Sequence, residues 1–273
     1  KISRVIFRLA RKCGYVQSLK KQFKLISIKD FTARLGNQLF QLSNAIAYSK
    51  KEGKGVAFPF WKYSNVFKGD FKPHNDPNPQ RVLWNEPGFG YNEIPKGANL
   101  LGGYYQSEKY FIDCEREIRD MFAFKGEIVD RVTEKNSEIL SSESPKVSMH
   151  LRRGDYLKLP KHHPVLDVSF FERASKEFPV DSIFLVFSDD TEWCKQNFPK
   201  GNYVFIEGQE DYEDLCLMTL CDHNCIANST FSWWGAWLNP NPDKIVVAPK
   251  AWFGPAYAHF PTNDLYCQRW KEI

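Results

Sequence analysis

Short apolar runs alternate with helical patterns throughout the second half of the chain. Runs rich in β-branched and aromatic residues predict strands, and apolar residues spaced three and four positions apart predict helices. The predicted strands are 145–151, 183–187, 203–207, 224–228 and 244–248, and the predicted helices are 168–178, 191–197, 211–221 and 230–238. This alternation is typical of a parallel sheet with helices on both faces. We therefore expect an α/β fold.

The first half starts with the same alternation and then becomes irregular. It gives strands 25–31, 56–60 and 99–105, helices 37–52, 107–122 and 127–140, and a loop-rich stretch over 61–99. A helix-like pattern returns at 264–273.

The length of the chain, 273 residues, exceeds the usual size of one domain. The patterns predict an N-terminal domain over 1–143, a second domain over 144–260, and a C-terminal segment over 261–273 that packs back on the first domain. Residues 1–24 form a basic extension of the N-terminal domain.

The charge of the chain narrows the class of partner. The net charge is +4 and there is no lysine-rich stripe, which favours a phosphorylated ligand and argues against nucleic acid. No apolar run approaches the ~18 residues that a membrane span needs. The basic extension, with apolar residues at mixed helical spacing, predicts either peripheral contact with a membrane surface or a solvated terminal helix.

The cysteines indicate the compartment. The chain has seven, an odd number without the spacing of a disulfide framework, and this is typical of free thiols in a reducing environment. We therefore expect a cytoplasmic protein, with the Golgi lumen as the alternative if an upstream anchor has been removed.

Two adjacent arginines follow a predicted strand in the segment HLRRGDY, His150 to Tyr156. Ligands of open α/β sheets bind at the carboxyl ends of strands, and a guanidinium group grips phosphate oxygens through two parallel hydrogen bonds. Arg152 and Arg153 therefore either bind an anion or pair with nearby carboxylates such as Asp155 and pin the loop.

Two further strand ends carry polar side chains. After strand 183–187, Asp190 is expected to cap the next helix, which leaves Asp189 free for a ligand. Ser229, Thr230 and Ser232 bracket the start of helix 230–238, where they either contact a phosphate or cap the helix. The tryptophans that follow are expected to be core residues.

Several phosphate-binding and metal-binding motifs are missing from the chain. It contains no glycine-rich phosphate loop with Lys-Ser/Thr, no dinucleotide fingerprint, and no Asp-x-Asp triplet that would hold a divalent ion against a diphosphate. The arginines must then supply the counter-charge.

Four segments together resemble the α1,2-fucosyltransferases of glycosyltransferase family 11. They are RLGNQLFQ at 34–41, GYYQSEKYF at 103–111, HLRRGDY at 150–156 and LCDHNCIANSTFSWWGAWLN at 220–239. The resemblance, which covers about 25–273, implies a GT-B-like fold with two Rossmann-like domains whose parallel sheets face a central cleft. It also implies that the donor is GDP-β-L-fucose, and that L-fucose moves with inversion and without metal or cofactor to the 2-hydroxyl of a terminal β-galactose.

The resemblance further assigns residue roles. Arg152 and Arg153 would hold the diphosphate, His150 and Asp189 would line the guanine or ribose pocket, Ser229, Thr230 and Ser232 would add phosphate contacts, and Asn37 and Arg34 would face the fucose or phosphate from the opposite domain. Arg152 is our prediction for the main catalytic group. Asp155 is either the base that deprotonates the acceptor or a salt-bridge strut, with His162, His163 and Asp167 as other candidate bases.

Two other functions remain open on this reasoning. One is a different GDP-sugar transferase, either an O-fucosyltransferase or an enzyme that uses another GDP-hexose, because paired arginines bind the diphosphate rather than the sugar. The other is a glycan-binding or nucleotide-binding protein without turnover. The acceptor is expected to be a β-galactosyl oligosaccharide or a lipid-linked glycan.

Overall fold

The computed structural model describes residues 25–73, 80–199 and 201–273. The basic extension, predicted to be either a membrane-contacting segment or a solvated terminal helix, lies outside these ranges. Among the helices that are described, none combines the length and the apolar character needed to cross a bilayer. The six cysteines in the described ranges are all free.

The first half of the chain forms a four-stranded parallel sheet in the order β2-β1-β4-β3. Its strands are β1 (Leu25–Ile28), β2 (Gly55–Ala57), β3 (Leu83–Asn85) and β4 (Leu100–Gly102), and its helices are α3 (Leu35–Lys51), α4 (Glu115–Met121), α5 (Gly126–Lys135) and α6 (Ser137–Leu140). The stretch 61–99, predicted to be loop-rich, therefore contains one strand, β3. The helix predicted over 107–122 is broken into two 3₁₀ turns, Glu108–Tyr110 and Ile112–Cys114, before α4.

The second half forms a six-stranded parallel sheet in the order β7-β6-β5-β8-β9-β10. Its strands are β5 (Lys146–Leu151), β6 (Ile183–Ser188), β7 (Tyr203–Phe205), β8 (His223–Cys225), β9 (Val246–Ala248) and β10 (Lys271–Glu272), and its helices are α7 (Val168–Ser175), α8 (Thr191–Asn197), α9 (Asp211–Leu220) and α10 (Thr230–Leu238). The predicted alternation is confirmed. The strand order reverses between β5 and β8, and such a reversal is where doubly wound sheets bind ligands.

The C-terminal segment is not a helix, contrary to the pattern at 264–273. It consists of turns that end in β10, which pairs with β9. Leu265 is 5% exposed and its carbonyl accepts from the indole of Trp233 at 2.7 Å. Asp264 accepts from the backbone of Tyr91 at 3.1 Å. Contacts with both halves of the molecule, rather than one apolar helix face, explain the spacing of its apolar residues.

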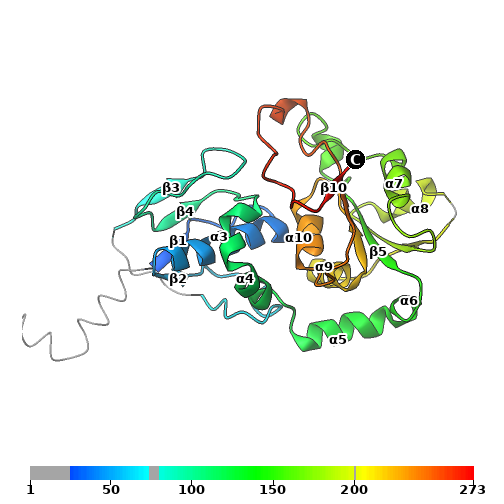
Figure 1. Cartoon of the computed structure of the whole chain (residues 1–273), viewed down its shortest axis with the longest axis horizontal. Helices are drawn as coiled ribbons and strands as arrows, with labels where there is room; N and C mark the ends of the chain where they lie inside the picture. The colour runs from blue at the N-terminus through cyan, green and yellow to red at the C-terminus, as the bar shows by residue number, and fades with distance from the viewer. Residues whose placement is uncertain (1–24, 74–79, 200) are drawn as a thin grey trace, which may run out of the picture.

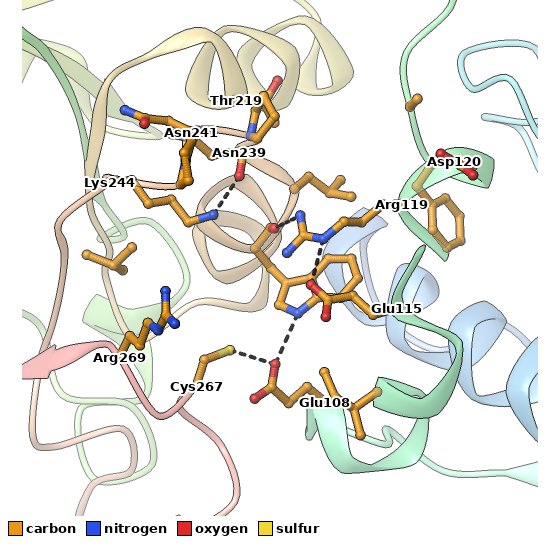
Figure 2. A pocket seen from close by; sticks show the side chains of 18 of the residues that line it. Glu108, Glu115, Arg119, Asp120, Thr219, Asn239, Asn241, Lys244, Cys267 and Arg269 are labelled. Atoms are coloured by element: carbon orange, nitrogen blue, oxygen red, sulfur yellow. Dashed lines mark hydrogen bonds and ion pairs between the residues drawn. The ribbon is translucent and has the colours of Figure 1, made fainter. Parts of the chain in front are cut away.

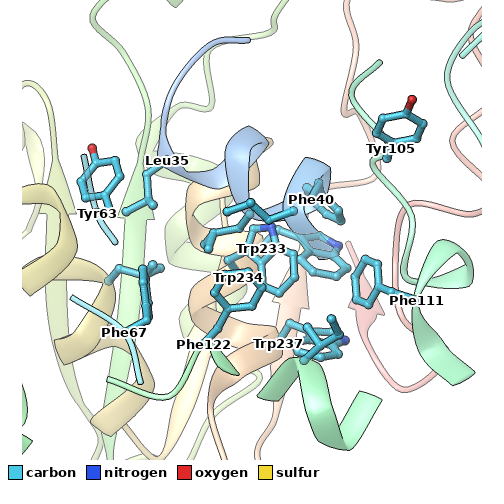
Figure 3. Close-up of a cluster of buried hydrophobic side chains, with 14 of the residues drawn as sticks. Leu35, Phe40, Tyr63, Phe67, Tyr105, Phe111, Phe122, Trp233, Trp234 and Trp237 are labelled. Atoms are coloured by element: carbon cyan, nitrogen blue, oxygen red, sulfur yellow. The ribbon is translucent and has the colours of Figure 1, made fainter. Parts of the chain in front are cut away.

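The larger of two hydrophobic core clusters in the described ranges joins the two halves, and the smaller one lies within the second half. Trp233 and Trp234 of α10 are fully buried and pack against Phe40 of α3, with ring centroids 4.5 and 5.0 Å away (Figure 3). In Figure 1, α3 and α10 lie between the two sheets. The prediction that the tryptophans are core residues is confirmed. Because the core is continuous across the halves, large hinge motion between them is not the default expectation, and the domain boundary at residue 143 stays a prediction.

Candidate active site

The loops that follow β1, β5 and β8 meet where the six-stranded sheet reverses its order. Gly36, in the first turn of α3, lies so close to α10 that a Cβ atom on it would be 2.5 Å from the carbonyl carbon of Thr230. Arg34 lies one residue before α3, with Nη2 3.8 Å from Oδ2 of Asp155. We call the group Arg34, Asn37, Arg152, Asp155 and Thr230 the strand-end site.

Arg152 is held between two carboxylates. Its Nη2 donates to Oδ1 of Asp155 at 2.6 Å, and its Nη1 lies 2.7 Å from Oδ2 of Asp189. The pairing that was one of the two predicted alternatives is therefore observed. The side chain of Asp155 is 51% exposed, whereas that of Arg152 is 14% exposed. An anion that approaches from solvent can therefore replace Asp155 at Nη2 and leave the second ion pair intact.

Arg153 is anchored away from Arg152. Its Nε donates to Oδ2 of Asp190 at 3.1 Å, and its guanidinium carbon lies 3.4 Å from the ring centroid of Trp193 on α8. Asp190 also caps α8 through the backbone N–H of Trp193, as predicted. The two adjacent arginines thus have different surroundings, and of the two only Arg152 belongs to the strand-end site.

Asp189 is not free for a ligand, contrary to the prediction. Besides its ion pair with Arg152, its Oδ1 accepts from the backbone N–H groups of Arg153 and Gly154 at 2.9 and 3.2 Å. A Cβ on Gly154 would lie 2.6 Å from Oδ2 of Asp189. The carboxylate therefore holds the arginine loop in place.

His150 lies behind the strand end rather than on its surface. It is 6% exposed, and burial lowers its pKa to about 3, so the ring is neutral at pH 7. Its Nδ1 is 2.9 Å from Oγ of Ser232, and that hydroxyl also lies 3.3 Å from the carbonyl of Ser229. The hydroxyl of Ser232 therefore bridges Nδ1 of His150 and the carbonyl of Ser229. Ser232, predicted to contact phosphate, is 2% exposed and instead orients His150.

Two helices begin at the strand-end site. Neither α3 nor α10 has an acidic residue in its first turn, and neither has a side-chain hydrogen bond from its N-cap residue. Ser229 is the N-cap residue and Thr230 the first residue of α10, so the predicted side-chain cap by Ser229 is not observed. The amide groups and positive dipole ends of both helices are therefore available to an anion.

Side chains of the first half tie a second loop to this site. Asn37 accepts at Oδ1 from Nε2 of Gln106 at 2.8 Å, and the buried Gln41 donates to the carbonyl of Gly103 at 2.7 Å. Gln106 and Gly36 were not predicted to take part in the site. Both lie in motifs that carry the family resemblance, but neither has a side chain whose chemistry would single it out.

Backbone strain is also concentrated here. Among the described residues, the non-glycine residues with positive φ are Ala33, at 59°, and Tyr105, at 56°. Ala33 precedes Arg34 after β1, and Tyr105 precedes Gln106 after β4. Strained conformations of this kind persist where surrounding contacts enforce them, which is common at binding sites.

The other candidate bases differ in their surroundings. His163 stacks on Tyr156, with ring centroids 4.6 Å apart, and burial lowers its pKa. Within the described part of the chain, Nδ1 of His163 and of His162 are buried without a hydrogen-bond partner. Asp167 caps α7, and its hydrogen bond with Ser169 and one from the α7 backbone lower its pKa. Asp167 is therefore a poor base, and His163 is a better one.

A large cavity lies at the other end of α10, away from the predicted site residues (Figure 2). Its volume is about 960 Å³, and it is lined by Glu108, Arg119, Trp237, Lys244 and Cys267, among others. Arg119 donates to the carbonyl of Trp237, and Lys244 donates to that of Asn239 at 2.5 Å. These two cations therefore satisfy carbonyl groups at the C-terminal end of α10.

Potential metal ligands do not gather in the described ranges. No group of three or more His, Cys, Asp or Glu side chains there is arranged to hold a metal ion. Metal independence stays a prediction.

The model of one protein family, Glycosyl transferase family 11, matches residues 2–273. The chain belongs to glycosyl transferase family 11. The resemblance carried by the four segments is confirmed, and the match includes most of the basic extension that we had placed before it.

Similar family members act on different sugars. The O-antigen biosynthesis glycosyltransferase WbnK of Escherichia coli is 35% identical over 58% of this chain and 56% of its own length. An α-1,2-colitosyltransferase of Escherichia coli is 31% identical over 88% of this chain and 86% of its own. The galactoside α-(1,2)-fucosyltransferase 2 of Oryctolagus cuniculus is 26% identical over 84% of this chain and 75% of its own.

Solved structures confirm the fold class. The α-1,6-fucosyltransferase NodZ from Bradyrhizobium, soaked with GDP-fucose, aligns with 80% of this chain and 93% of its own at a TM-score of 0.52 and 15% identity. POFUT1 in complex with GDP-fucose aligns with 83% of this chain and 98% of its own at a TM-score of 0.56 and 11% identity. With its parallel sheets, this family 11 chain has the predicted GT-B-like α/β fold.

Proposed function

We propose that this family 11 protein is an inverting, metal-independent transferase that moves L-fucose from GDP-β-L-fucose to the 2-hydroxyl of a terminal β-galactose. The observation that carries the proposal is the convergence of Arg34, Arg152 and the N-termini of α3 and α10 at the strand-end site. These positive groups come from both halves of the molecule, so they suit a diphosphate held between them. The α-1,2 linkage in the names of two relatives supports the choice of hydroxyl.

The proposed roles follow from where charge develops. The acceptor oxygen bonds to C1 of fucose from the face opposite the phosphate, and the bond between C1 and the β-phosphate oxygen breaks with its electron pair. Negative charge therefore grows on GDP as it leaves. Arg152 and the first amides of α10 stabilise this charge, while Asn37 and Arg34 contact the donor from the first half. Because the charge is larger in the transition state than in the bound donor, Arg152 lowers the barrier.

The proton of the acceptor hydroxyl passes to a base, for which Asp155 and His163 are the candidates. Asp155 lies beside Arg152 and is half exposed, as suits a base. It also accepts a hydrogen bond from Arg152, so it can equally be a strut that the diphosphate displaces. Asp155→Asn separates the roles: loss of a base lowers kcat across the pH range, whereas loss of a strut tightens GDP binding and leaves kcat within a few fold. Full activity of Asp155→Asn across pH together with a large kcat loss in His163→Ala would assign the base to His163.

A second donor is favoured by one specific comparison. The α-1,2-colitosyltransferase is 31% identical over 88% of this chain, and colitose is L-fucose without its 3-hydroxyl. A site that hydrogen-bonds the 3-hydroxyl rejects the deoxy sugar strongly, whereas an apolar pocket separates the two sugars weakly. The ratio of kcat/KM for GDP-fucose and GDP-colitose therefore decides between the two donors.

The test is a donor panel with lactose as the β-galactoside acceptor, in the presence and absence of EDTA. GDP-fucose, GDP-colitose and GDP-mannose are compared by GDP release and by mass of the product. The proposal expects transfer of fucose with the same rate in EDTA. Preferred turnover of another GDP-sugar, or GDP binding without any transfer, would replace it with one of the alternatives named from the sequence.

A further inference from the structure

Four aromatic side chains from both halves of the molecule pack together beside the strand-end site. The ring of Phe89 stacks on Tyr104 at 5.8 Å between centroids, and it contacts Phe253 at 4.6 Å and Phe260 at 4.7 Å. Phe89 follows β3 and Tyr104 follows β4, whereas Phe253 and Phe260 belong to the segment after β9. We call Phe89, Tyr104, Phe253 and Phe260 the aromatic wall.

Tyr104 is exposed although its position is fixed. It is 40% exposed, while its neighbour Tyr105 is 1% exposed. Both backbone N–H groups donate to Oε2 of Glu86 at 2.8 Å, and the φ angles of Gly103 and Tyr105 are positive, at 156° and 56°. This strained turn points two successive tyrosines in different directions, one into the core and one outward.

The half-buried carboxylate that holds this turn, that of Glu86, was not predicted from the sequence. Glu86 accepts at Oε1 from the hydroxyl of Tyr110 at 2.9 Å, in addition to the two N–H groups of the turn. Burial raises its pKa. A partly desolvated carboxylate with three donors fixes the loop firmly, so the exposed ring of Tyr104 is presented in one orientation.

The aromatic wall is connected to the strand-end site from both halves. On one side, Gln106 lies two residues after Tyr104 and donates to Asn37 at 2.8 Å. On the other side, Phe253 contacts His163 at 6.3 Å, and His163 stacks at 4.6 Å on Tyr156, which follows the arginine loop. The aromatic wall is therefore joined to the strand-end site by a continuous chain of contacts in each half.

We propose that the aromatic wall binds the terminal sugar of the acceptor, with the exposed face of Tyr104 as its stacking platform. The negative face of an aromatic ring attracts the polarised C–H groups on the apolar face of a pyranose. In galactose the axial 4-hydroxyl leaves the hydrogens on C3, C4 and C5 together on the opposite face, so galactose presents a larger apolar face than glucose. The assignment of this sugar as the acceptor rests on the proposed function.

Tyr104→Ala tests the wall, with Tyr91→Ala as the matched control. Tyr91 is 41% exposed, but its ring contacts Tyr110 at 5.0 Å and no member of the aromatic wall. Tyr104→Ala is expected to raise the KM for lactose roughly fivefold to tenfold, the size of one lost aromatic contact, with the Kd for GDP unchanged. Tyr91→Ala should behave like the wild type, whereas Tyr104→Phe keeps a stacking ring and should raise the KM less than Tyr104→Ala does. Thermal melting verifies that each variant is folded.

Direct binding of lactose, measured by saturation-transfer NMR in the presence of GDP, makes the result independent of turnover. If the wild type transfers fucose to lactose and Tyr104→Ala leaves the KM unchanged, the wall is refuted and the proposed function stands. If the wild type binds lactose without transferring fucose, and Tyr104→Ala no longer shows the lactose signal, the proposed function fails and the wall stands. Absence of both transfer and lactose binding in the wild type overturns both.

Discussion

Replacing Arg152 with lysine removes the fork but keeps the charge. The two terminal nitrogens of Arg152 lie 2.6 and 2.7 Å from oxygens of Asp155 and Asp189, and one ammonium group cannot span both. Loss of one preorganised donor to a developing oxyanion costs about 2.7–4 kcal/mol, or 10²–10³ in kcat. Because this donor acts mainly in the transition state, we expect kcat to fall about 10²–10³-fold while the KM for GDP-fucose rises less than about tenfold.

The assay is initial-rate GDP release at saturating donor and acceptor, with Arg131→Lys as the control. Arg131 also binds a carboxylate, that of Glu213, at 2.7 Å, but it is half exposed and lies on α5. Arg131→Lys should retain wild-type kcat. If kcat of Arg152→Lys stays within threefold of the wild type while its melting temperature is normal, the proposed role of this arginine is wrong.

Three further predictions test the surroundings of the site. Gly36→Ala places a Cβ against the backbone of α10, so we expect a loss of about 1–3 kcal/mol of stability in urea unfolding and a lower kcat. The control is Gly126→Ala, whose Cβ meets nothing within 4 Å, and it should be neutral or stabilising in the same assay. Burial raises the pKa of Asp214 to about 7, so its charge does not destabilise the folded state below pH 3.8 and destabilises it fully above pH 7. Asp214→Asn should therefore become more stable relative to the wild type as the pH rises from 4 to 8, by up to roughly 4 kcal/mol. A stability difference that does not change with pH would contradict this. Ser232→Ala leaves Nδ1 of His150 buried and unpaired, which should cost about 1–3 kcal/mol; urea unfolding with no change would show that their hydrogen bond is unimportant.

The central strands of the second half were predictable because they are buried on both faces. Strand β6 reads as a continuous apolar run, and parallel strands covered by helices produce such runs. Asp190 marks the start of α8 by its capping chemistry, so the bounds of α8 agree with the prediction.

The elements that were missed have weak local signals. Strand β3 has three residues, all at least partly exposed, and it pairs on one side only, with β4. The apolar residues at 264–273 have a spacing that suits a helix, but they are distributed between contacts with both halves. Tertiary contacts determine the conformation of both segments, and such contacts cannot be recognised from a short stretch of sequence.

The candidate site was predictable in its residue types but not in its pairings. Arg152 was identified because it follows a strand, and ligands of open α/β sheets bind at the carboxyl ends of strands. Whether Asp189 contacts a ligand or anchors the arginine loop depended on its hydrogen bond with the backbone of Gly154. The contact of Gly36 with Thr230 likewise joins residues far apart in the sequence. The first contact depends on the pairing of β5 with β6 and the second on the packing of α3 on α10, and no local pattern encodes either.

The most direct test of the account is NMR analysis of the product formed from GDP-β-L-fucose and lactose. The account predicts an α-L-fucosyl unit on O2 of the galactose, which means inversion at C1, and formation at the same rate in EDTA. A β-linked product, or fucose on another hydroxyl, would contradict the central claim.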